Sequence, residues 1–469
     1  MKTRLHPTVI IENIFRSIWA IIALTAYIIS NGLQSSDGDD INKAINFLTG
    51  HSNNIVVMII VIFFAVILIF TLFFYIRWRN TYLIIDKDEL TVKTGRLFKN
   101  VSKINILDIA TINIKRNILE QVFGTASLKI ELNNNIDTSI KTKLVFKNDI
   151  AKGIKNRILN GEEEQEIDSL INYTSKDILR HMWLSVDLRS FIILLVMYLI
   201  ILVTDNGEIF KNSLIIIVVG IIVFLYPLFV SVIKNFFSYY NFKATREDNT
   251  IKLSYGLLTT YHYSLPIEKI NALIIKQSLQ ARLSNYYCLE VVNAGVGNDK
   301  NENEKTIISL YIPAKMISEV LHNIVPEFEN EISLKKESKG AFYHHLVKKI
   351  PLFLISLSLV PFIKYYFIFI WIFLLVCSYG EYRTNKIGFN NDKIIIQKGI
   401  INKKITITLF NNIEYINLKT YAFSKILKTY QLNFSIVAPG NNNTLYTGLF
   451  TKQLLEKAIN TYLGEKDEH

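Results

Sequence analysis

The sequence predicts an α+β membrane protein in which transmembrane helical hairpins alternate with three small antiparallel sheet or barrel domains, each closed by a C-terminal helix. Three observations predict this class. First, 50% of the 469 residues are hydrophobic and 20% are charged, so membrane-embedded and water-facing parts must alternate along the chain. Second, apolar runs long enough to cross a bilayer recur. Third, one pattern of turns, glycines and apolar residues occurs three times, each time after an apolar run.

The apolar runs define the expected hairpins. Spanning hydrocarbon takes roughly 17 to 25 residues, and suitable runs lie near 9–30, 55–76, 189–204 and 213–233. The first follows a short basic lead without a convincing cleavage site, so we expect a retained span rather than a signal peptide. The run 350–379 is long for one helix and short for two, and Pro361 and Lys364 near its middle favour a third hairpin over a single span.

The basic residues predict the orientation. The net charge is +12, and many cations flank the span ends that face the repeats and the amino terminus: Lys2, Arg4, Arg77, Arg79, Arg180, Arg189, Lys234, Lys348, Lys349, Arg383 and Lys386. The opposite loops are acidic or nearly neutral, with Asp37, Asp39, Asp40, Asp205 and Glu208. Because basic flanks stay inside, we expect a multi-pass membrane protein with termini and repeats in the cytoplasm.

Each repeat has the same order of turns and strands. A polar turn is followed by alternating apolar residues, which predicts a hairpin leading into a half-buried strand. A glycine comes next at the same offset, and a tight turn is the expected reason for it: Gly95, Gly256 and Gly399. An apolar trio expected to line each barrel follows: Ile109, Ile112 and Ile114; Ile270, Leu273 and Ile275; Ile413, Ile416 and Leu418.

A short helix and a final helix complete each repeat. The short helix is marked by apolar residues one turn apart: Ile118 and Val122, Leu279 and Leu283, Ala422 and Ile426. After one more strand pair, an amphipathic helix begins near residues 148, 314 and 451. Antiparallel strands closed by such a helix predict a small curved sheet or barrel with the helix as its plug.

A lysine occurs at one equivalent position in all three repeats, and packing alone does not require it. Lys115, Lys276 and Lys419 each end a strand at the same place in the repeat. They are candidate anion or lipid-headgroup contacts, for a lipid or an acidic partner. The competing interpretation is an ordinary charged strand end that was retained after duplication.

The arrangement resembles the bacterial pleckstrin-homology-like membrane proteins of the YdbT type, with three repeats of the domain in one chain. The resemblance implies a split-barrel fold for each repeat, a cytoplasmic location and no reaction. It also implies a smaller membrane partner with one domain of the same family and a role in tolerance of membrane-active peptides. One departure is that family copies often end the short helix with glycine, whereas this chain has Gly124, Asn285 and Lys428 there.

The sequence contains none of the common catalytic patterns. P-loop, GxSxG, HExxH and CxxC motifs are missing. Cys288 and Cys377 stand far apart, and the adjacent His344 and His345 would point in different directions on a helix, so they are expected to be interfacial side chains. Nothing resembles a nucleic-acid recognition element. We therefore expect no enzyme activity, no cofactor, no metal and no nucleic-acid partner.

These observations predict alternating segments. They are 1–80, first transmembrane hairpin; 81–160, first pleckstrin-homology-like domain; 161–240, linker and second hairpin; 241–327, second domain; 328–384, linker and third hairpin; and 385–469, third domain. Amphipathic lead-in helices are expected before the second and third hairpins, lying at the membrane interface or simply extending the spans.

The expected function is a non-enzymatic membrane platform for assembly or binding. Its expected partners are membrane lipid, including anionic lipid, the smaller family member and further copies of itself. The alternative is a transporter or flippase-like component gated by the cytoplasmic domains. A weaker option is a lipid sensor that reads anionic headgroups through the three lysines.

Overall fold

The structure is a computed structural model of the chain. It describes residues 1–17, 67–86, 88–95, 99–132, 143–158, 173–186, 214–293, 305–329, 332–358, 367–436 and 444–467. The chain forms two compact units, Met1–Glu163 and Glu164–His469. The first contains one repeat and the second contains two, so the two units are described separately.

The first unit contains two groups of antiparallel strands. One is a sheet in the order β1-β2-β3-β4, made of β1 (Lys2–Arg4), β2 (Tyr82–Ile85), β3 (Glu89–Gly95) and β4 (Lys99–Asn105). In the other, β6 pairs with both of its neighbours: β5 (Ile109–Arg116), β6 (Thr125–Leu132) and β7 (Leu144–Lys147). The short helix α4 (Ile118–Val122) joins β5 to β6, and α5 (Asn148–Ile158) follows β7.

A single hydrophobic core holds this unit together. Strand residues of both groups, including Leu90 and Leu144, are completely buried in it. Helix α5 turns Ala151, Ile154 and Ile158 onto the same core, which makes it the plug that the sequence predicts. The trio Ile109, Ile112 and Ile114 is buried there, as expected.

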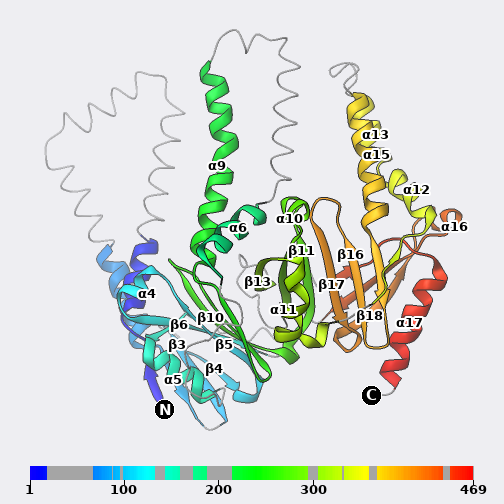
Figure 1. Cartoon of the computed structure of the whole chain (residues 1–469). Coiled ribbons are helices and arrows are strands. Elements are labelled where there is room, and N and C mark those ends of the chain that lie inside the picture. Colours follow the sequence, from blue (N-terminus) through cyan, green and yellow to red (C-terminus); the bar gives the residue numbers. More distant parts are fainter. Residues whose placement is uncertain are drawn as a thin grey trace. The chain divides into compact units, whose positions relative to one another are not determined.

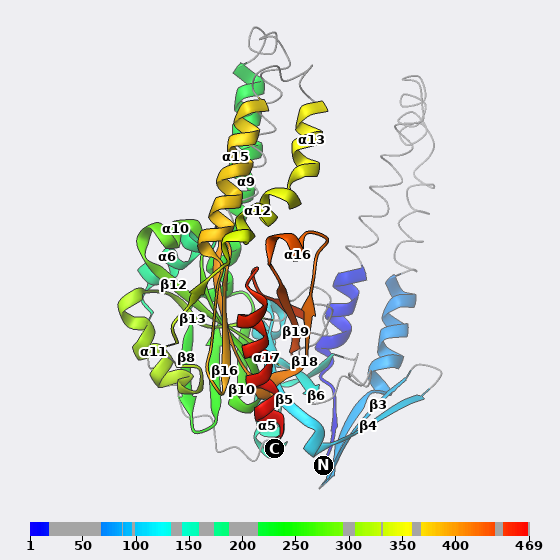
Figure 2. The same cartoon turned by 90° about the vertical axis from the view of Figure 1, so that its right-hand side faces the viewer.

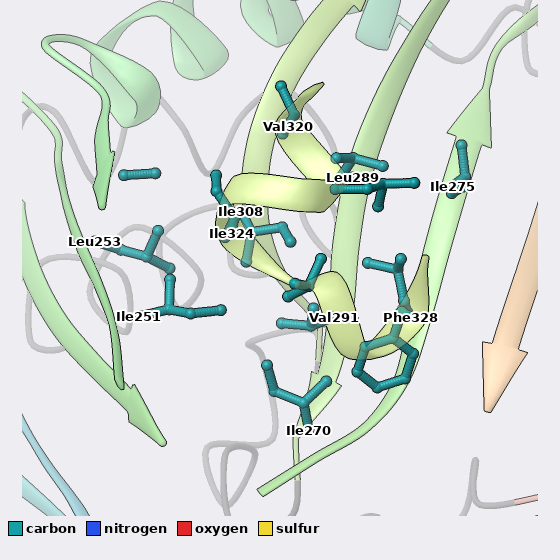
Figure 3. Packing of buried hydrophobic residues seen from close by; sticks show 14 of the residues in the cluster. Ile251, Leu253, Ile270, Ile275, Leu289, Val291, Ile308, Val320, Ile324 and Phe328 are labelled. Atoms are coloured by element: carbon teal, nitrogen blue, oxygen red, sulfur yellow. The ribbon is translucent and has the colours of Figure 1, made fainter. Parts of the chain in front are cut away.

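The second unit begins with two helices and the second repeat. The helices are α6 (Ser175–Ser185) and α9 (Leu214–Tyr239). The strands are β8 (Lys243–Glu247), β9 (Thr250–Tyr255), β10 (Thr260–Pro266), β11 (Ile270–Gln277), β12 (Tyr286–Asn293) and β13 (Lys305–Pro313). The short helix α10 (Leu279–Ser284) follows β11, and α11 (Ile317–Ile324) closes the domain. Figure 3 shows Val320 and Ile324 of α11 among strand residues such as Leu289.

The third repeat has the same order of elements. It is preceded by β14 (Lys335–Lys336), α12 (Lys339–Lys348), α13 (Ile350–Ser358) and α15 (Phe367–Thr384). Its strands are β15 (Lys386–Phe389), β16 (Lys393–Lys398), β17 (Lys403–Leu409), β18 (Ile413–Lys419), β19 (Gln431–Ile436) and β20 (Thr444–Tyr446). The short helix is α16 (Ser424–Leu427), and α17 (Lys452–Asp467) is the closing helix.

A seven-stranded sheet joins the second and third repeats. Its order is β13-β12-β11-β17-β16-β15-β14, so β11 of one repeat pairs with β17 of the next. Alternate residues of β11 point to opposite faces: Leu273 packs in the core of the second domain and Ala272 in that of the third. The two domains therefore share one sheet and cannot separate without breaking it.

Helices α9 and α15 extend from the second unit. Figures 1 and 2 show both rising from the same end of the sheets, with α6, α10, α12 and α16 gathered around their bases. Large apolar side chains are exposed along these helices, for example Phe229 on α9 and Phe369 on α15.

The expected transmembrane hairpins need correction. None of the helices in the described ranges combines the length and apolarity that a membrane span requires. Helix α13 has only 9 residues, and α15 carries Glu381 and Arg383 within its 18. The predicted run 189–204 and most of the runs 9–30 and 55–76 lie outside the described residues. The part of the prediction that stands is α+β with three antiparallel, helix-closed repeats.

Candidate functional site

The short helix exposes an apolar side chain at one position in all three repeats. Val122 on α4 is 75% exposed, Leu283 on α10 is 84% exposed and Ile426 on α16 is 77% exposed. Exposed apolar residues that occur singly are ordinary on protein surfaces. Here, however, the exposed apolar residue recurs at the same repeat position in every copy.

The local sequence explains why this residue projects outward. Asn117 caps α4 with a capping box in which its side chain accepts from the Glu120 N–H. Ser278 caps α10 by accepting from the Ala281 N–H alone. After the helix the backbone turns sharply through a left-handed residue: Gly124 at φ 65°, Asn285 at φ 58° and Lys428 at φ 50°. The second and third repeats thus retain the left-handed turn, although Asn285 and Lys428 stand there in place of glycine.

A lead-in helix docks beside the short helix in each repeat. In the first, residues 8–17 form the helix, and Asn117 Nδ2 donates to Oε1 of its Glu12 at 2.9 Å. In the second, the cap residue Ser278 donates its hydroxyl to the Leu184 carbonyl of α6. In the third, His344 of α12 lies 3.2 Å from the Thr429 hydroxyl, just after α16. Each short helix is therefore fixed to the helix that precedes the domain.

We call the contact between a lead-in helix and the domain that follows it a junction. The third junction, made by α12, contains a buried ionic network. Nε2 of His345 lies 2.9 Å from Oε2 of Glu337, and its Nδ1 lies 3.0 Å from Oε2 of Glu381. Lys349 approaches the other oxygen of Glu381 at 3.2 Å. Burial alone would lower the pKa of His345, but the hydrogen bonds and charges of the two glutamates raise it to about 8.

The second junction uses histidine differently. His181 follows its helix cap Thr174 at the same distance as His345 follows the cap Ser338. Its Nδ1 accepts the Tyr311 N–H at 3.2 Å, and the rings of Tyr239 and Tyr311 pack against it. Burial, with a smaller contribution from the charge of Lys276, lowers the pKa of His181 to about 3. This histidine is therefore neutral at physiological pH, whereas His345 is largely charged.

The three candidate lysines occupy equivalent strand positions but have different surroundings. Lys276 forms an ion pair with Glu290, with Nζ 3.0 Å from Oε1. Lys419 is exposed, with Nζ 5.4 Å from the centre of the Tyr421 ring. Lys115 is half-buried, and its carbonyl accepts from the Ser127 hydroxyl at 2.9 Å. Their role as anion contacts stays a prediction.

The glycine position is occupied by a tight backbone turn in the second and third repeats. Gly256 and Gly399 have φ of 109° and 101°. A Cβ atom on either would lie 2.0 Å from a carbonyl oxygen, that of Thr259 or Asn402 respectively. Gly95 ends β3, next to residues 96–98, which are not among those described.

Sequence reasoning missed the junction network. The adjacent histidines were expected at an interface, yet His344 and His345 are 7% and 8% exposed. Glu337 was not singled out because a glutamate between two basic stretches looks like solvated surface. The available signal was the repeated lead-in helix, which carries a histidine at one position in two of its copies.

Three helix-closed antiparallel domains, each docked on its lead-in helix, define a tandem protein of pleckstrin-homology-like domains. The family model for the bacterial PH domain matches residues 20–172, 190–324 and 349–458, and the chain belongs to this family. The chain is also similar to the UPF0699 transmembrane protein YdbT of Bacillus subtilis (strain 168). The two are 21% identical over 402 residues, which cover 77% of this chain and 80% of that protein.

Proposed function

We propose that this chain is a non-enzymatic, membrane-associated platform whose short helices contact lipid. The observation that carries the proposal is the exposed apolar residue that recurs at Val122, Leu283 and Ile426. Burying one such side chain in lipid contributes about 1.5–3 kcal/mol. Three contacts held by the docked lead-in helices would therefore orient all three domains against the bilayer.

Two further observations support membrane association. Exposed apolar residues line α9, α13 and α15, among them Leu225, Leu354 and Phe373, and water is an unfavourable environment for so much apolar surface. The similar protein from Bacillus subtilis is named a transmembrane protein.

The charge of the chain favours anionic lipid on the cytoplasmic side. The net charge is +12, and basic segments near a bilayer gain about 1 kcal/mol per Lys or Arg from anionic headgroups. Lys419 is exposed at the end of β18, shortly before α16 begins at Ser424, where such a headgroup would lie. The domains and both termini are accordingly proposed to face the cytoplasm.

A fluorescence experiment tests the lipid contact. Leu283→Cys and Ile426→Cys are labelled in the full chain with a polarity-sensitive dye and reconstituted with anionic vesicles. Glu268→Cys is the matched control, because Glu268 is exposed on the short 3-10 helix at the opposite end of β11 from α10. We expect blue-shifted emission and quenching by lipid-borne quenchers at residues 283 and 426 alone. Equal emission and quenching at all three positions would refute the proposal.

The physiological role that we propose is supported by the family resemblance. We assign the platform to tolerance of membrane-active antimicrobial peptides, acting with a smaller membrane protein that has one domain of the same family. A cytoplasmic platform has no means of degrading a peptide outside the cell, so protection would come from altering the bilayer or displacing the peptide within it. Deleting the gene should shift dose-response curves for cationic or cyclic peptides to lower doses. Superimposable dose-response curves for all peptides would refute this role but would leave the proposed lipid contact unaffected.

A further inference from the structure

The pairing of β11 with β17 shows how one repeat joins the next. The strands are antiparallel, with Ala272 opposite Thr408, Ile274 opposite Thr406 and Lys276 opposite Lys404. β11 is the fourth strand of the second repeat, and β17 is the third strand of the third repeat. The fourth strand of one repeat thus pairs with the third strand of the repeat that follows. This contact is a general connector because it uses backbone groups that every repeat has.

The equivalent strand of the third repeat lies at a sheet edge. Strand β18 occupies the repeat position of β11, but it lies at the edge of the three-stranded sheet β18-β19-β20 among the described strands. Tyr415, which corresponds to Ala272, is 53% exposed, whereas Ala272 is completely buried. The outward backbone N–H and C=O groups of an edge strand are a template for another strand.

The first repeat has the complementary edge. Strand β4 occupies the repeat position of β17, and it is the last strand of the sheet β1-β2-β3-β4. Val101, which corresponds to Ile405, is 51% exposed. The chain therefore carries both halves of its own connector, one in the first repeat and one in the third.

We propose that β18 of one copy of this chain pairs antiparallel with β4 of a second copy. Transferring the observed β11–β17 register places Tyr415 opposite Ile104, Asn417 opposite Ser102, and Lys419 opposite Asn100. Leu418 then meets Val101, so apolar side chains face each other across the strands. The proposed β18–β4 register places no two like charges directly opposite each other. The observed β11–β17 pairing does contain one such pair, Lys276 opposite Lys404.

The interaction is head-to-tail, and it has a consequence for assembly. A contact between two different surfaces closes within a pair of molecules only if both copies of it form about a two-fold axis, and otherwise it produces a larger ring or an open chain of copies. This inference does not depend on the lipid contact proposed above, because it uses strand edges and not the short helices.

Disulfide trapping between two variants of the full chain tests the pairing. Asn417→Cys and Ser102→Cys, carried on chains with tags of different size, are mixed and mildly oxidised. Directly opposed residues in antiparallel strands have Cα atoms about 4.5–5.5 Å apart, within the range of a disulfide. Asn417 and Ser102 are exposed, so neither substitution disturbs the core. We expect a heterodimer band well above the background from the native Cys288 and Cys377 in the unmodified chain.

A matched mixture controls for random collision. Thr406→Cys replaces Ser102→Cys, because Thr406 holds the same repeat position on β17, whose edge is already paired with β11. We expect little heterodimer in that mixture. The proposal is overturned if both mixtures give equal yields or if the first gives none. Dimers of Asn417→Cys alone would show β18 meeting β18, and would also overturn it.

Discussion

Nε2 of His345 lies 2.9 Å from Oε2 of Glu337, a carboxylate whose side chain is completely buried. The other oxygen of Glu337 accepts the Leu449 N–H at 2.7 Å and the Asn385 amide at 3.0 Å. Helix α12 is thereby tied to the residue before β15 and to the segment after β20 of the third domain. Movement of the lead-in helix must be transmitted to the domain, because breaking this contact would leave a buried charge without a partner.

The first prediction is that the third domain loses stability as pH rises. The pKa of His345 is raised to about 8, above the ordinary 6.5, so its stabilising contribution is complete below pH 6.5 and disappears as pH rises through 8. A shift of this size corresponds to about 2 kcal/mol. Denaturant unfolding of the full chain at pH 6 and pH 9, monitored by a probe on α12, should show the loss.

His345→Gln provides the control for this pH effect. Glutamine can still donate a hydrogen bond but does not titrate, so the variant should be less stable at pH 6 and should not lose stability on the change to pH 9. The buried, neutral His181 acts in the opposite direction, because its unfolded form binds a proton near pH 6, and it does so equally in the wild type and in the variant. Identical pH profiles for the wild type and His345→Gln would contradict the assignment.

The second prediction concerns the glycine turn. Gly256→Ala should destabilise the second domain by about 2 kcal/mol or more, because φ is 109° and the new Cβ would meet the Thr259 carbonyl oxygen at 2.0 Å. Gly153→Ala in α5 is the control, since no neighbouring atom lies within 4 Å of its added Cβ. Removing a helix-interior glycine should stabilise by about 1 kcal/mol. Opposite signs are expected in chemical denaturation, and equal effects would argue against the turn geometry.

The sequence predicts each domain better than it predicts how domains join. Strand alternation and helix amphipathicity are local, so the helix-closed repeats and buried residues such as Ile112 and Leu273 follow from periodicity. Pairing of β11 with β17 depends on residues far apart, as in the hydrogen bond from Thr408 to the Asn271 carbonyl, 137 residues away. No local pattern specifies which edge meets which, so this contact could not be predicted.

The candidate site shows the same limit. The spacing of Ile118 and Val122 locates the short helix, but exposure of its second apolar residue depends on the cap and on the left-handed turn after it. Adjacent histidines on a helix do point in different directions, as expected. Their burial could not be predicted, because Glu337 and Glu381 reach His345 from other elements.

The third prediction tests the core of the first domain. Ile112→Asp should destabilise the first unit by several kcal/mol, because Ile112 is completely buried and an aspartate there would have no ionic partner. Leu107→Asp is the control on the neighbouring 3-10 helix, where the side chain is 84% exposed, and it should change stability by less than about 0.5 kcal/mol. Limited proteolysis should cleave only the Ile112 variant rapidly. Resistance of that variant would contradict the strand assignment.

The last prediction separates structural from binding roles among the equivalent lysines. Lys276→Gln should destabilise the second domain by about 1–3 kcal/mol, because it leaves the nearly buried carboxylate of Glu290 without its ion-pair partner. Lys419→Gln removes only an exposed cation above the Tyr421 ring, so its effect on stability should be below about 1 kcal/mol. Lys419 is thus the position where a binding role can be measured without loss of folding.

Vesicle binding completes this comparison. If Lys419 contacts anionic headgroups, Lys419→Gln should weaken the salt-sensitive part of binding to anionic vesicles, while binding to neutral vesicles stays unchanged. Lys419→Arg should retain it, because the charge is kept. Unchanged binding of Lys419→Gln at low salt would make this lysine an ordinary charged strand end. Equal stability of Lys276→Gln and the wild type would show that Glu290 finds another partner, and the ion pair would lose its structural role.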